Sequence, residues 1–384
     1  MKSTSGVFWT FAVVCLALMG SVVAVAQTQE KHQEEPWHFA VSGDSRNCGD
    51  VMMPTIAAGV LRHDVDFYWH LGDFRLMSGI DEDIAHRYGS TLTLKDYRRE
   101  AWGDFIAHQI APFGLLPVYL GIGNHELYGK TEADVVAQFA YWLDTPELRR
   151  QRAADNPQSD SLTYYHWQKR HVDFINLDNA PEEGFSNAQL QWLEGVLAKD
   201  KEDPAILTVV VGMHRALPNS LSCGHSMNGD IGTPADVARA SLTSGRRAYQ
   251  DLWKWHRDTG KRVYILASHS HFFMERIFET PFWRDSKDAE RGVLPGWIVG
   301  TAGAVRYALP EGLPKDIRAQ TGVGGYLLGT VGADGEIKFE FQEIKQEDVP
   351  KPVYSQFKQD FVQQCFVENK NFRPHRPPES CMEK

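Results

Sequence analysis

The sequence predicts an α/β fold in which short strands alternate with helices and polar side chains gather at the strand ends. From His38 onward, short apolar runs alternate with amphipathic segments, which is the pattern of strands and helices in layered α/β folds. Several of these runs end in a glycine followed by a carboxylate, amide or imidazole. In open α/β sheets such groups meet at the carboxyl ends of the strands, so we expect one functional site there.

Three predicted strands lead directly into candidate site residues. Residues 39–41 run into Gly43-Asp44, residues 66–71 into Gly72-Asp73, and residues 118–122 into Gly123-Asn124. Helices are predicted over residues 51–61, 94–110, 133–143, 188–198 and 246–256, and hairpins over residues 161–178 and 326–341. We expect one domain over residues 36–344, followed by an extension over residues 345–384 that is rich in Lys, Gln, Glu and Pro.

The composition is that of an ordinary globular protein. The chain has 384 residues, of which 42% are hydrophobic and 23% are charged, and this argues against a disordered, collagen-like or multi-span membrane protein. The formal net charge is -10, and no run of Lys and Arg forms the basic stripe that a nucleic-acid duplex requires. We therefore expect no duplex partner. An acidic enzyme can still bind a phosphorylated substrate where metal ions supply local positive charge.

The first residues have the pattern of an export signal. Met1-Lys2 precedes an uncharged, mainly apolar run over residues 7–26 that ends in Ala24-Val25-Ala26. This pattern predicts a signal peptide over residues 1–26 and a periplasmic or secreted mature protein. An uncleaved anchor remains the alternative, because the run approaches spanning length. No later apolar run is that long, so we expect no stable membrane insertion after cleavage.

Side chains with metal-ligand chemistry follow five predicted strands. In order they are Asp44-Ser45-Arg46, Asp73, Asn124-His125-Glu126, His214, and Ser268-His269-Ser270-His271. Each signal alone is weak, since a lone Gly-Asp is usually a turn. Together, imidazole and carboxylate groups without a thiolate suit Zn, Mn or Fe in a hydrolytic site. The candidate metal ligands are therefore Asp44, Asp73, Asn124, His214, His269 and His271.

These motifs resemble the pattern of the calcineurin-like metallophosphoesterases, which is Asp-x-His, Gly-Asp, Gly-Asn-His-Asp/Glu, a lone His and Gly-His-x-His. Four of the five motifs match over residues 44–271, the last with Ser268 in place of its glycine. The resemblance implies a layered β-sandwich flanked by helices, with the metal site at the C-terminal ends of the strands. It also implies hydrolysis of a small-molecule phosphoester by a metal-bound hydroxide; whether a monoester or a diester is cleaved stays open.

The resemblance further implies a role for each residue. Asp73 would bridge two metal ions of Mn, Zn or Fe. Asp44 and His271 would complete one ion's site, and Asn124, His214 and His269 would complete the other. His125 would lie beside the leaving-group oxygen, oriented by a carboxylate, as a proton donor or charge stabiliser. The catalytic residues would then be His125, Asp73 and Arg46.

The first motif departs from the family, because Arg46 replaces the expected histidine. A guanidinium cannot ligate a metal. Three outcomes are open: water replaces the ligand, His225 reaches in, or that site binds metal weakly. Arg46 itself either holds two phosphate oxygens or forms a salt bridge with Glu126 or another local carboxylate. Purple acid phosphatases also lack this histidine but carry a tyrosine three residues after the bridging aspartate, where this chain has Leu76. A tyrosinate–iron site is therefore disfavoured.

Loss of the signal would remove Cys15 and leave four cysteines, which are Cys48, Cys223, Cys365 and Cys381. An even number in an oxidising compartment predicts disulfides, although buried free thiols remain possible. We favour Cys48 with Cys223 and Cys365 with Cys381. Cys48 lies shortly after Asp44 and Cys223 shortly after His214, so both loops should leave the same edge of the sheet.

Two other functions remain open. In the first, the altered motif has abolished turnover and the chain is a metal-dependent binding or scaffolding module. His125 argues against this, because its implied role is catalytic. In the second, the enzyme hydrolyses a lipid or cell-wall phosphoester at a membrane. The sequence predicts no oligomeric state.

Overall fold

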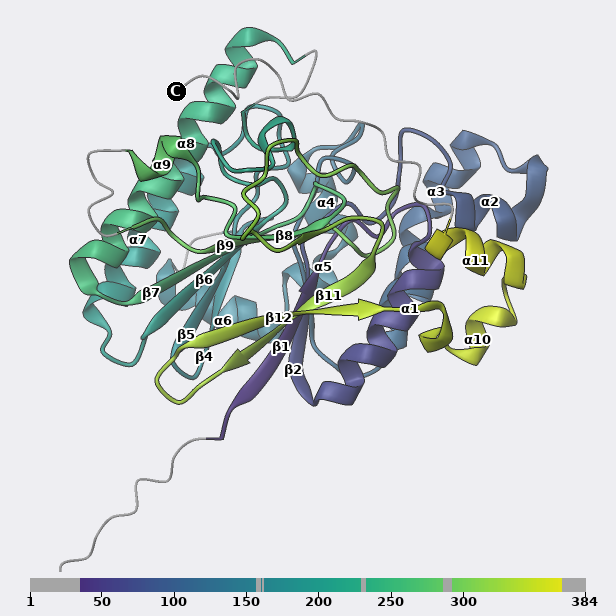
Figure 1. Ribbon diagram of the computed structural model, residues 1–384, viewed down its shortest axis with the longest axis horizontal. Helices are drawn as coiled ribbons and strands as arrows, with labels where there is room; N and C mark the ends of the chain where they lie inside the picture. Colours follow the sequence, from purple (N-terminus) through teal and green to yellow (C-terminus); the bar gives the residue numbers. More distant parts are fainter. Residues whose placement is uncertain (1–34, 157–159, 161, 229–232, 286–291, 368–384) are drawn as a thin grey trace, which may run out of the picture. The chain divides into compact units, whose positions relative to one another are not determined.

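The structure is a computed structural model that describes residues 35–156, 160, 162–228, 233–285 and 292–367 (Figure 1). The predicted signal peptide and Cys381 lie outside these residues, so the structure does not test them. Among the described residues, no helix has both the length and the apolar composition needed to cross a bilayer.

The first sheet has five strands in the order β12-β11-β1-β2-β3. Its parallel part consists of β1 (Trp37–Ser42), β2 (Val65–His70) and β3 (Val118–Leu120). The antiparallel hairpin of β11 (Gly324–Val331) and β12 (Ile337–Ile344) joins the sheet beside β1, which confirms the predicted hairpin over residues 326–341. The hairpin turn at Asp334 and Gly335 therefore lies where the sequence predicted it.

The second sheet has seven strands in the order β10-β8-β9-β7-β6-β5-β4. Its bounds are β4 Tyr165–Lys169, β5 Val172–Asn176, β6 Thr208–Met213, β7 Arg262–Ala267, β8 Phe273–Glu275, β9 Gly296–Val299 and β10 Ala319–Gln320. The strands β5, β6, β7 and β9 are parallel, whereas β4 and β5 form the predicted antiparallel hairpin.

The two sheets pack face to face through aromatic side chains. Phe39 and Phe67 of the first sheet stack with their ring centroids 5.3 Å apart. Phe174 of the second sheet meets both rings edge-on at 5.0 Å. The ring of Trp69 lies over Gly212, where an added Cβ would come within 2.2 Å of it. The sandwich therefore depends on aromatic rings from both sheets, with Gly212 leaving space for the ring of Trp69.

Helices cover the outer faces of the sandwich (Figure 1). Beside the first sheet lies α1 (Gly49–Val60), and α7 (Asn187–Glu202) and α8 (Ala235–Thr259) pack on the second. The remaining helices are α2 Glu82–Tyr88, α3 Leu94–Phe105, α4 Glu132–Gln138, α5 Ala140–Leu143, α6 Pro146–Asp155, α9 Pro281–Arg284, α10 Lys351–Tyr354 and α11 Gln359–Val367. This confirms the predicted α/β class with helix-flanked sheets.

Some predicted helix bounds were wrong. The helix expected over residues 94–110 ends at Phe105 and continues as a π-helical turn, Ile106–Ile110. The segment 133–143 forms two short helices instead of one. The helix expected over residues 246–256 is part of α8, which begins at Ala235. Its first turns carry mainly Ala, Ser, Thr and Arg, so apolar periodicity did not reveal them.

A disulfide joins Cys48 to Cys365, with their Cα atoms 5.7 Å apart. The predicted pairs Cys48–Cys223 and Cys365–Cys381 are therefore wrong. Cys365 lies on α11, and this helix brings it to the start of α1, where Cys48 precedes Gly49. Apolar side chains before and on α11 are buried, among them Phe357, Phe361 and Val362. The packing of α11 on α1 thus determines which cysteine pairs with Cys48. The positions of the loops in the sequence could not reveal this packing.

Candidate metal centre

The structure places all six predicted ligands after the C-terminal ends of parallel strands. Asp44 follows β1, Asp73 follows β2, Asn124 follows β3, His214 follows β6, and His269 and His271 follow β7. The ends of the two sheets are joined by backbone hydrogen bonds, since Gly43 N–H donates to the carbonyl of Val299 at 3.1 Å. Within the second sheet, Ser268 N–H donates to the carbonyl of His214 at 2.9 Å and joins the ends of β6 and β7. These bonds hold motifs far apart in sequence at one edge.

Three of these residues have a left-handed backbone although none is glycine. The φ angles are 61° at Asp44, 60° at Asp73 and 64° at His269. This conformation is uncommon for residues with a Cβ and persists only where the surrounding structure enforces it. The sharp turn at each strand end directs the side chain into the site. The backbone is therefore strained at three of the residues that are predicted to bind metal.

One group of donor atoms converges on a single point. Nε2 of His214 lies 3.3 Å from Oδ1 of Asp73, 3.2 Å from Oδ1 of Asn124 and 3.0 Å from Nδ1 of His269. Among the described His, Cys, Asp and Glu side chains, those of Asp73, His214 and His269 form a set with ligand atoms within 4.8 Å of one another. All three residues are buried.

The electrostatics of this group favour a cation. Burial alone would lower the pKa of His214, but the neighbouring Asp73 carboxylate raises it to about 9. Burial lowers the pKa of His269 well below its usual value, so this imidazole is neutral. A proton on Nε2 of His214 would have three acceptor atoms around it and could satisfy only one of them well. A divalent ion could instead be coordinated by all four atoms, which are Nε2 of His214 and the three acceptors around it. These residues therefore fit a metal ion.

Asp44 and His271 form a second pair beside this group. Oδ1 of Asp44 lies 3.3 Å from Nε2 of His271 and has no hydrogen-bond partner among the described residues. Oδ2 of Asp44 accepts hydrogen bonds of 2.6 Å from the Ser268 hydroxyl and from His269 N–H. Ser268, which stands where the family has glycine, therefore orients a predicted ligand.

Arg46 lies between the two groups and is largely buried. Its guanidinium donates hydrogen bonds to Nε2 of His125 and, at 2.9 Å, to Nε2 of His271. Its Nε lies 3.7 Å from Oδ2 of Asp73. The local carboxylate that pairs with Arg46 is thus Asp73. Burial would lower the pKa of Arg46, but the Asp73 charge raises it, so the guanidinium stays charged.

Glu126 has a different role from the salt bridge considered for it. Its carboxylate accepts hydrogen bonds from the backbone N–H groups of Asp73 at 2.7 Å, Phe74 at 2.8 Å and Gly123 at 2.8 Å. Burial and the nearby Asp73 charge raise the pKa of Glu126 to about 8. Glu126 therefore ties the loop after β2 to the loop after β3, and it does not contact Arg46 through any described hydrogen bond or ion pair.

The ring of His125 is held by a backbone carbonyl, and its Nε2 lies 3.8 Å from Oδ2 of the Asp73 carboxylate. Its Nδ1 donates to the carbonyl of Leu76, and its backbone N–H donates to Oδ1 of Asp73 at 3.1 Å. Because Nδ1 carries the hydrogen, Nε2 offers a lone pair, which accepts the hydrogen bond from Arg46. Burial lowers the pKa of His125. In this arrangement His125 orients Arg46 and has no proton on Nε2 to give away.

Sequence reasoning missed Tyr307. Its ring stacks on that of His271, with centroids 4.0 Å apart, and on that of His225 at 4.6 Å. Burial raises the pKa of Tyr307, and the nearby charge of Arg46 opposes this rise. His225 therefore packs against Tyr307, with its ring centroid 5.7 Å from that of His269. The only available signal was the glycine-rich segment over residues 300–304, which follows an apolar run and precedes Tyr307.

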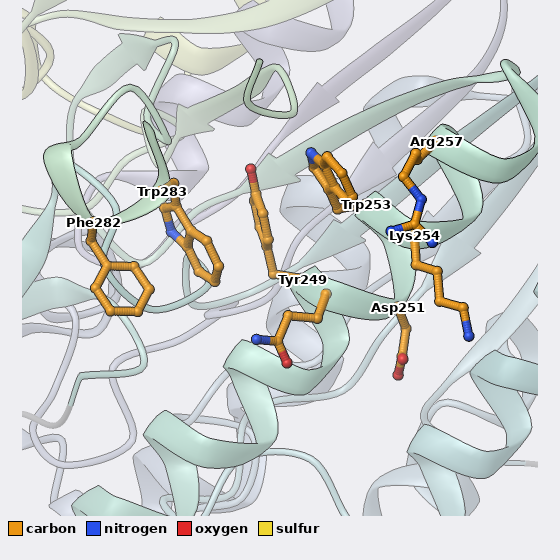
Figure 2. A pocket seen from close by; sticks show the side chains of 8 residues that line it. Tyr249, Asp251, Trp253, Lys254, Arg257, Phe282 and Trp283 are labelled. Atoms are coloured by element: carbon orange, nitrogen blue, oxygen red, sulfur yellow. The ribbon is translucent and has the colours of Figure 1, made fainter. Parts of the chain in front are cut away.

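A separate aromatic pocket of about 380 Å³ lies along α8 and α9 (Figure 2). Tyr249, Trp253 and Trp283 form its wall, and Tyr249 stacks on Trp283 with centroids 3.8 Å apart. Trp253 is buried and its indole N–H donates to the carbonyl of Gly292 at 3.1 Å. These tryptophans therefore pack the rim of the fold, and none of the predicted ligands lines this pocket.

No protein-family model matches the chain, and no curated protein matches it. Among solved structures, the fold is similar to that of purple acid phosphatase PPD1 from yellow lupin (Lupinus luteus) seeds, with a TM-score of 0.54 and 15% identity. The match covers 81% of this chain and 52% of the lupin chain, so this chain spans about half the length of that protein. A structure of PhoD aligns with a TM-score of 0.47 and 14% identity over 80% of this chain and 68% of that one. Together with the two sheets and the motifs at their strand ends, the first likeness shows that this chain has the calcineurin-like metallophosphoesterase fold.

Proposed function

We propose that this chain hydrolyses a phosphoester at a metal centre formed by the strand ends. The observation that carries the proposal is the convergence of Asp73, Asn124, His214 and His269 on one point. Their donor atoms are two oxygens and two imidazole nitrogens, a set that suits Mn, Zn or Fe in hydrolytic enzymes. The metallophosphoesterase fold supports the same reaction class, although fold alone does not determine activity.

The metal ion would supply the Lewis acidity that the reaction needs, by neutralising phosphate charge and making water acidic at neutral pH. The residues of the chain hold and orient the reactants. Asp44 lies beside this group, with one oxygen held by Ser268 and by the backbone of His269. Asp73 receives backbone and side-chain contacts from three neighbouring loops, which keep its carboxylate in place.

Arg46 is proposed to bind the phosphate group. Its guanidinium is planar, always charged and able to donate two parallel hydrogen bonds to phosphate oxygens. It already lies beside Asp73 and His271, which places positive charge next to the proposed ion. His125 would act with it as a positioning residue, because its Nε2 accepts a hydrogen bond from the guanidinium. This role replaces the proton donation that the family resemblance implied.

The substrate is proposed to be a small-molecule phosphoester, hydrolysed in the periplasm or outside the cell. The apolar run over residues 7–26 and the Cys48–Cys365 disulfide both support export, because disulfides persist in oxidising compartments.

The test combines metal analysis with a panel of phosphomonoesters and phosphodiesters. The wild-type protein should contain Mn, Zn or Fe and hydrolyse at least one class of ester, and Asp73→Asn should lose both properties. Asp66→Asn is the matched control, because Asp66 lies on the same strand, β2, and contacts only Lys169 by a 3.2 Å ion pair in the described structure. Turnover that survives Asp73→Asn would refute the mechanism. A metal-loaded wild-type protein that cleaves no ester would favour the binding module.

A further inference from the structure

The guanidinium of Arg46 donates hydrogen bonds to the lone pairs of two imidazole rings, those of His125 and His271. Nδ1 of His271 donates to the carbonyl of Val305 at 2.5 Å, so its Nε2 carries no hydrogen and can only accept. His125 is fixed in the same tautomer by the carbonyl of Leu76. Both Nε2 atoms accept hydrogen bonds from Arg46. In a metal site, the lone pair of His271 would instead face an ion.

Asp73 directs its two carboxylate oxygens toward two different neighbours. Oδ1 lies 3.3 Å from Nε2 of His214, within the group that fits a metal ion. Oδ2 lies 3.7 Å from Nε of Arg46 and accepts no hydrogen bond among the described residues. A carboxylate that bridges two ions has the same arrangement, with one cation at each oxygen. Here the second cation belongs to the chain itself.

Arg46 is also confined to this position. Its exposed fraction is 8%, and both of its terminal nitrogens donate hydrogen bonds to imidazole rings. An arginine stays protonated, whereas a lysine or histidine can lose a proton and become neutral. The positive charge of Arg46 therefore remains at this position. An ion bound by Asp44 and His271 would have to displace this buried guanidinium from its hydrogen bonds to His125 and His271.

We propose that this centre holds a single metal ion and that the guanidinium of Arg46 replaces the second. The inference rests on the proposed function, since it concerns the same site. The ion is held by Asp73, Asn124, His214 and His269. The charge that a second ion would bring to the phosphate is supplied by Arg46, whose planar guanidinium can also donate hydrogen bonds to phosphate oxygens. This revises the two-ion expectation from the family resemblance.

The first test counts metal ions in the purified full-length protein. After saturation with Mn²⁺ and removal of excess ion, elemental analysis should give one ion per chain. Electron paramagnetic resonance should show isolated Mn²⁺, without the coupling between two ions that a bridging carboxylate produces. Two ions per chain at similar affinity would overturn this inference and leave the proposed function standing. No bound ion at all would overturn both.

The second test restores the family's ligand with Arg46→His. The new imidazole would join Nε2 of His271 and the unpaired oxygens Asp44 Oδ1 and Asp73 Oδ2. We expect two Mn²⁺ per chain and a coupled resonance spectrum. If a correctly folded Arg46→His protein still binds one ion, Arg46 is not what excludes the second, and the inference fails. Should this variant not fold, the wild-type count still decides the question.

Arg46→His both removes the positive charge and adds a metal ligand, so a third variant is needed to separate these two changes. Arg46→Leu removes only the charge, because leucine can neither ligate a metal nor bind phosphate. It should bind one ion, as the wild type does, while kcat/KM falls by about 10²–10³, the usual effect of removing a preorganised charged donor. Arg46→Lys should keep part of the activity with one ion. A kcat/KM for Arg46→Leu equal to that of the wild type would show that the guanidinium does not replace an ion in catalysis.

Discussion

Cys48 and Cys365 form a disulfide across 317 residues and connect the start of α1 to the last described helix. Cys48 is also hydrogen bonded to the site loops, because its N–H donates to the carbonyls of Arg46 and Gly303 at 3.0 and 3.2 Å. The disulfide therefore holds α11 next to the backbone segment that carries Arg46.

Removal of this disulfide should lower the stability of the fold. In Cys48→Ser/Cys365→Ser we expect the free energy of unfolding to drop by about 2–5 kcal/mol, since the unfolded chain loses a long-range cross-link. Denaturant titration measures this loss. Non-reducing peptide mapping of the wild type should recover a peptide containing Cys48 linked to one containing Cys365. A Cys48–Cys223 peptide would contradict the structure.

Gly300→Ala should damage the site. An added Cβ would lie 2.3 Å from the carbonyl oxygen of Ser270 and 2.6 Å from Oδ2 of Asp44. Because backbone atoms cannot move aside easily, Asp44 should shift, and we expect weaker metal binding and at least a tenfold loss of kcat/KM. Gly195→Ala is the control, since nothing lies within 4 Å of the added atom on α7. That variant should be as active as wild type and more stable by up to about 1 kcal/mol. Equal behaviour of the two variants would be inconsistent with the described packing.

The pair of His125 and Arg46 should behave as one unit. His125→Ala should retain its metal ion but lose activity, because the guanidinium would lose the acceptor that orients it. A double-mutant cycle with Arg46→Leu, read as kcat/KM, should show a coupling of at least about 1 kcal/mol. Additive losses would indicate that His125 acts independently, for example by donating a proton to the leaving group.

His166 should make stability depend on pH. Its Nδ1 lies 2.7 Å from Oδ2 of Asp173 and its Nε2 lies 2.6 Å from Oδ2 of Asp155, which also pairs with Lys199. Burial would lower the pKa of His166, but the charge of Asp173 and the hydrogen bonds to both carboxylates raise it to about 10. Because the pKa of His166 is higher in the folded than in the unfolded chain, protonation of His166 stabilises the fold. This stabilisation is complete below about pH 6.5, the usual pKa of histidine, and is lost as pH rises through about 10.

We therefore expect His166→Gln to lower the free energy of unfolding by about 3 kcal/mol at pH 7, because it removes the charged partner of the buried Asp173 and the half-buried Asp155. The difference from wild type should shrink steadily towards pH 10. Denaturant titrations of both proteins at pH 7, 8.5 and 10 measure it. A difference that is constant across this range would show that His166 is not charged in the folded protein.

Much of this protein could be predicted from local sequence. The strands β1, β2 and β3 and the six candidate ligands followed from apolar runs that end in glycine and a polar residue, because parallel strands bring their carboxyl ends to one edge. The two hairpins were predicted as well. The motifs also predicted the fold that the structure shows. Such features depend on a few neighbouring residues, so a sequence pattern can reveal them.

Other features were decided only by tertiary structure. The partner of Cys48 depends on where α11 packs, and no local pattern contains that information. The contacts of Arg46 with His125 and His271 span 79 and 225 residues of sequence, and the stacking of Tyr307 on His271 arises in the same way. The sequence by itself determined that an arginine stands where the family has a metal-binding histidine. Only the packed structure placed its guanidinium on the lone pairs of two imidazoles, because the position of a long, flexible side chain depends on the groups that surround it.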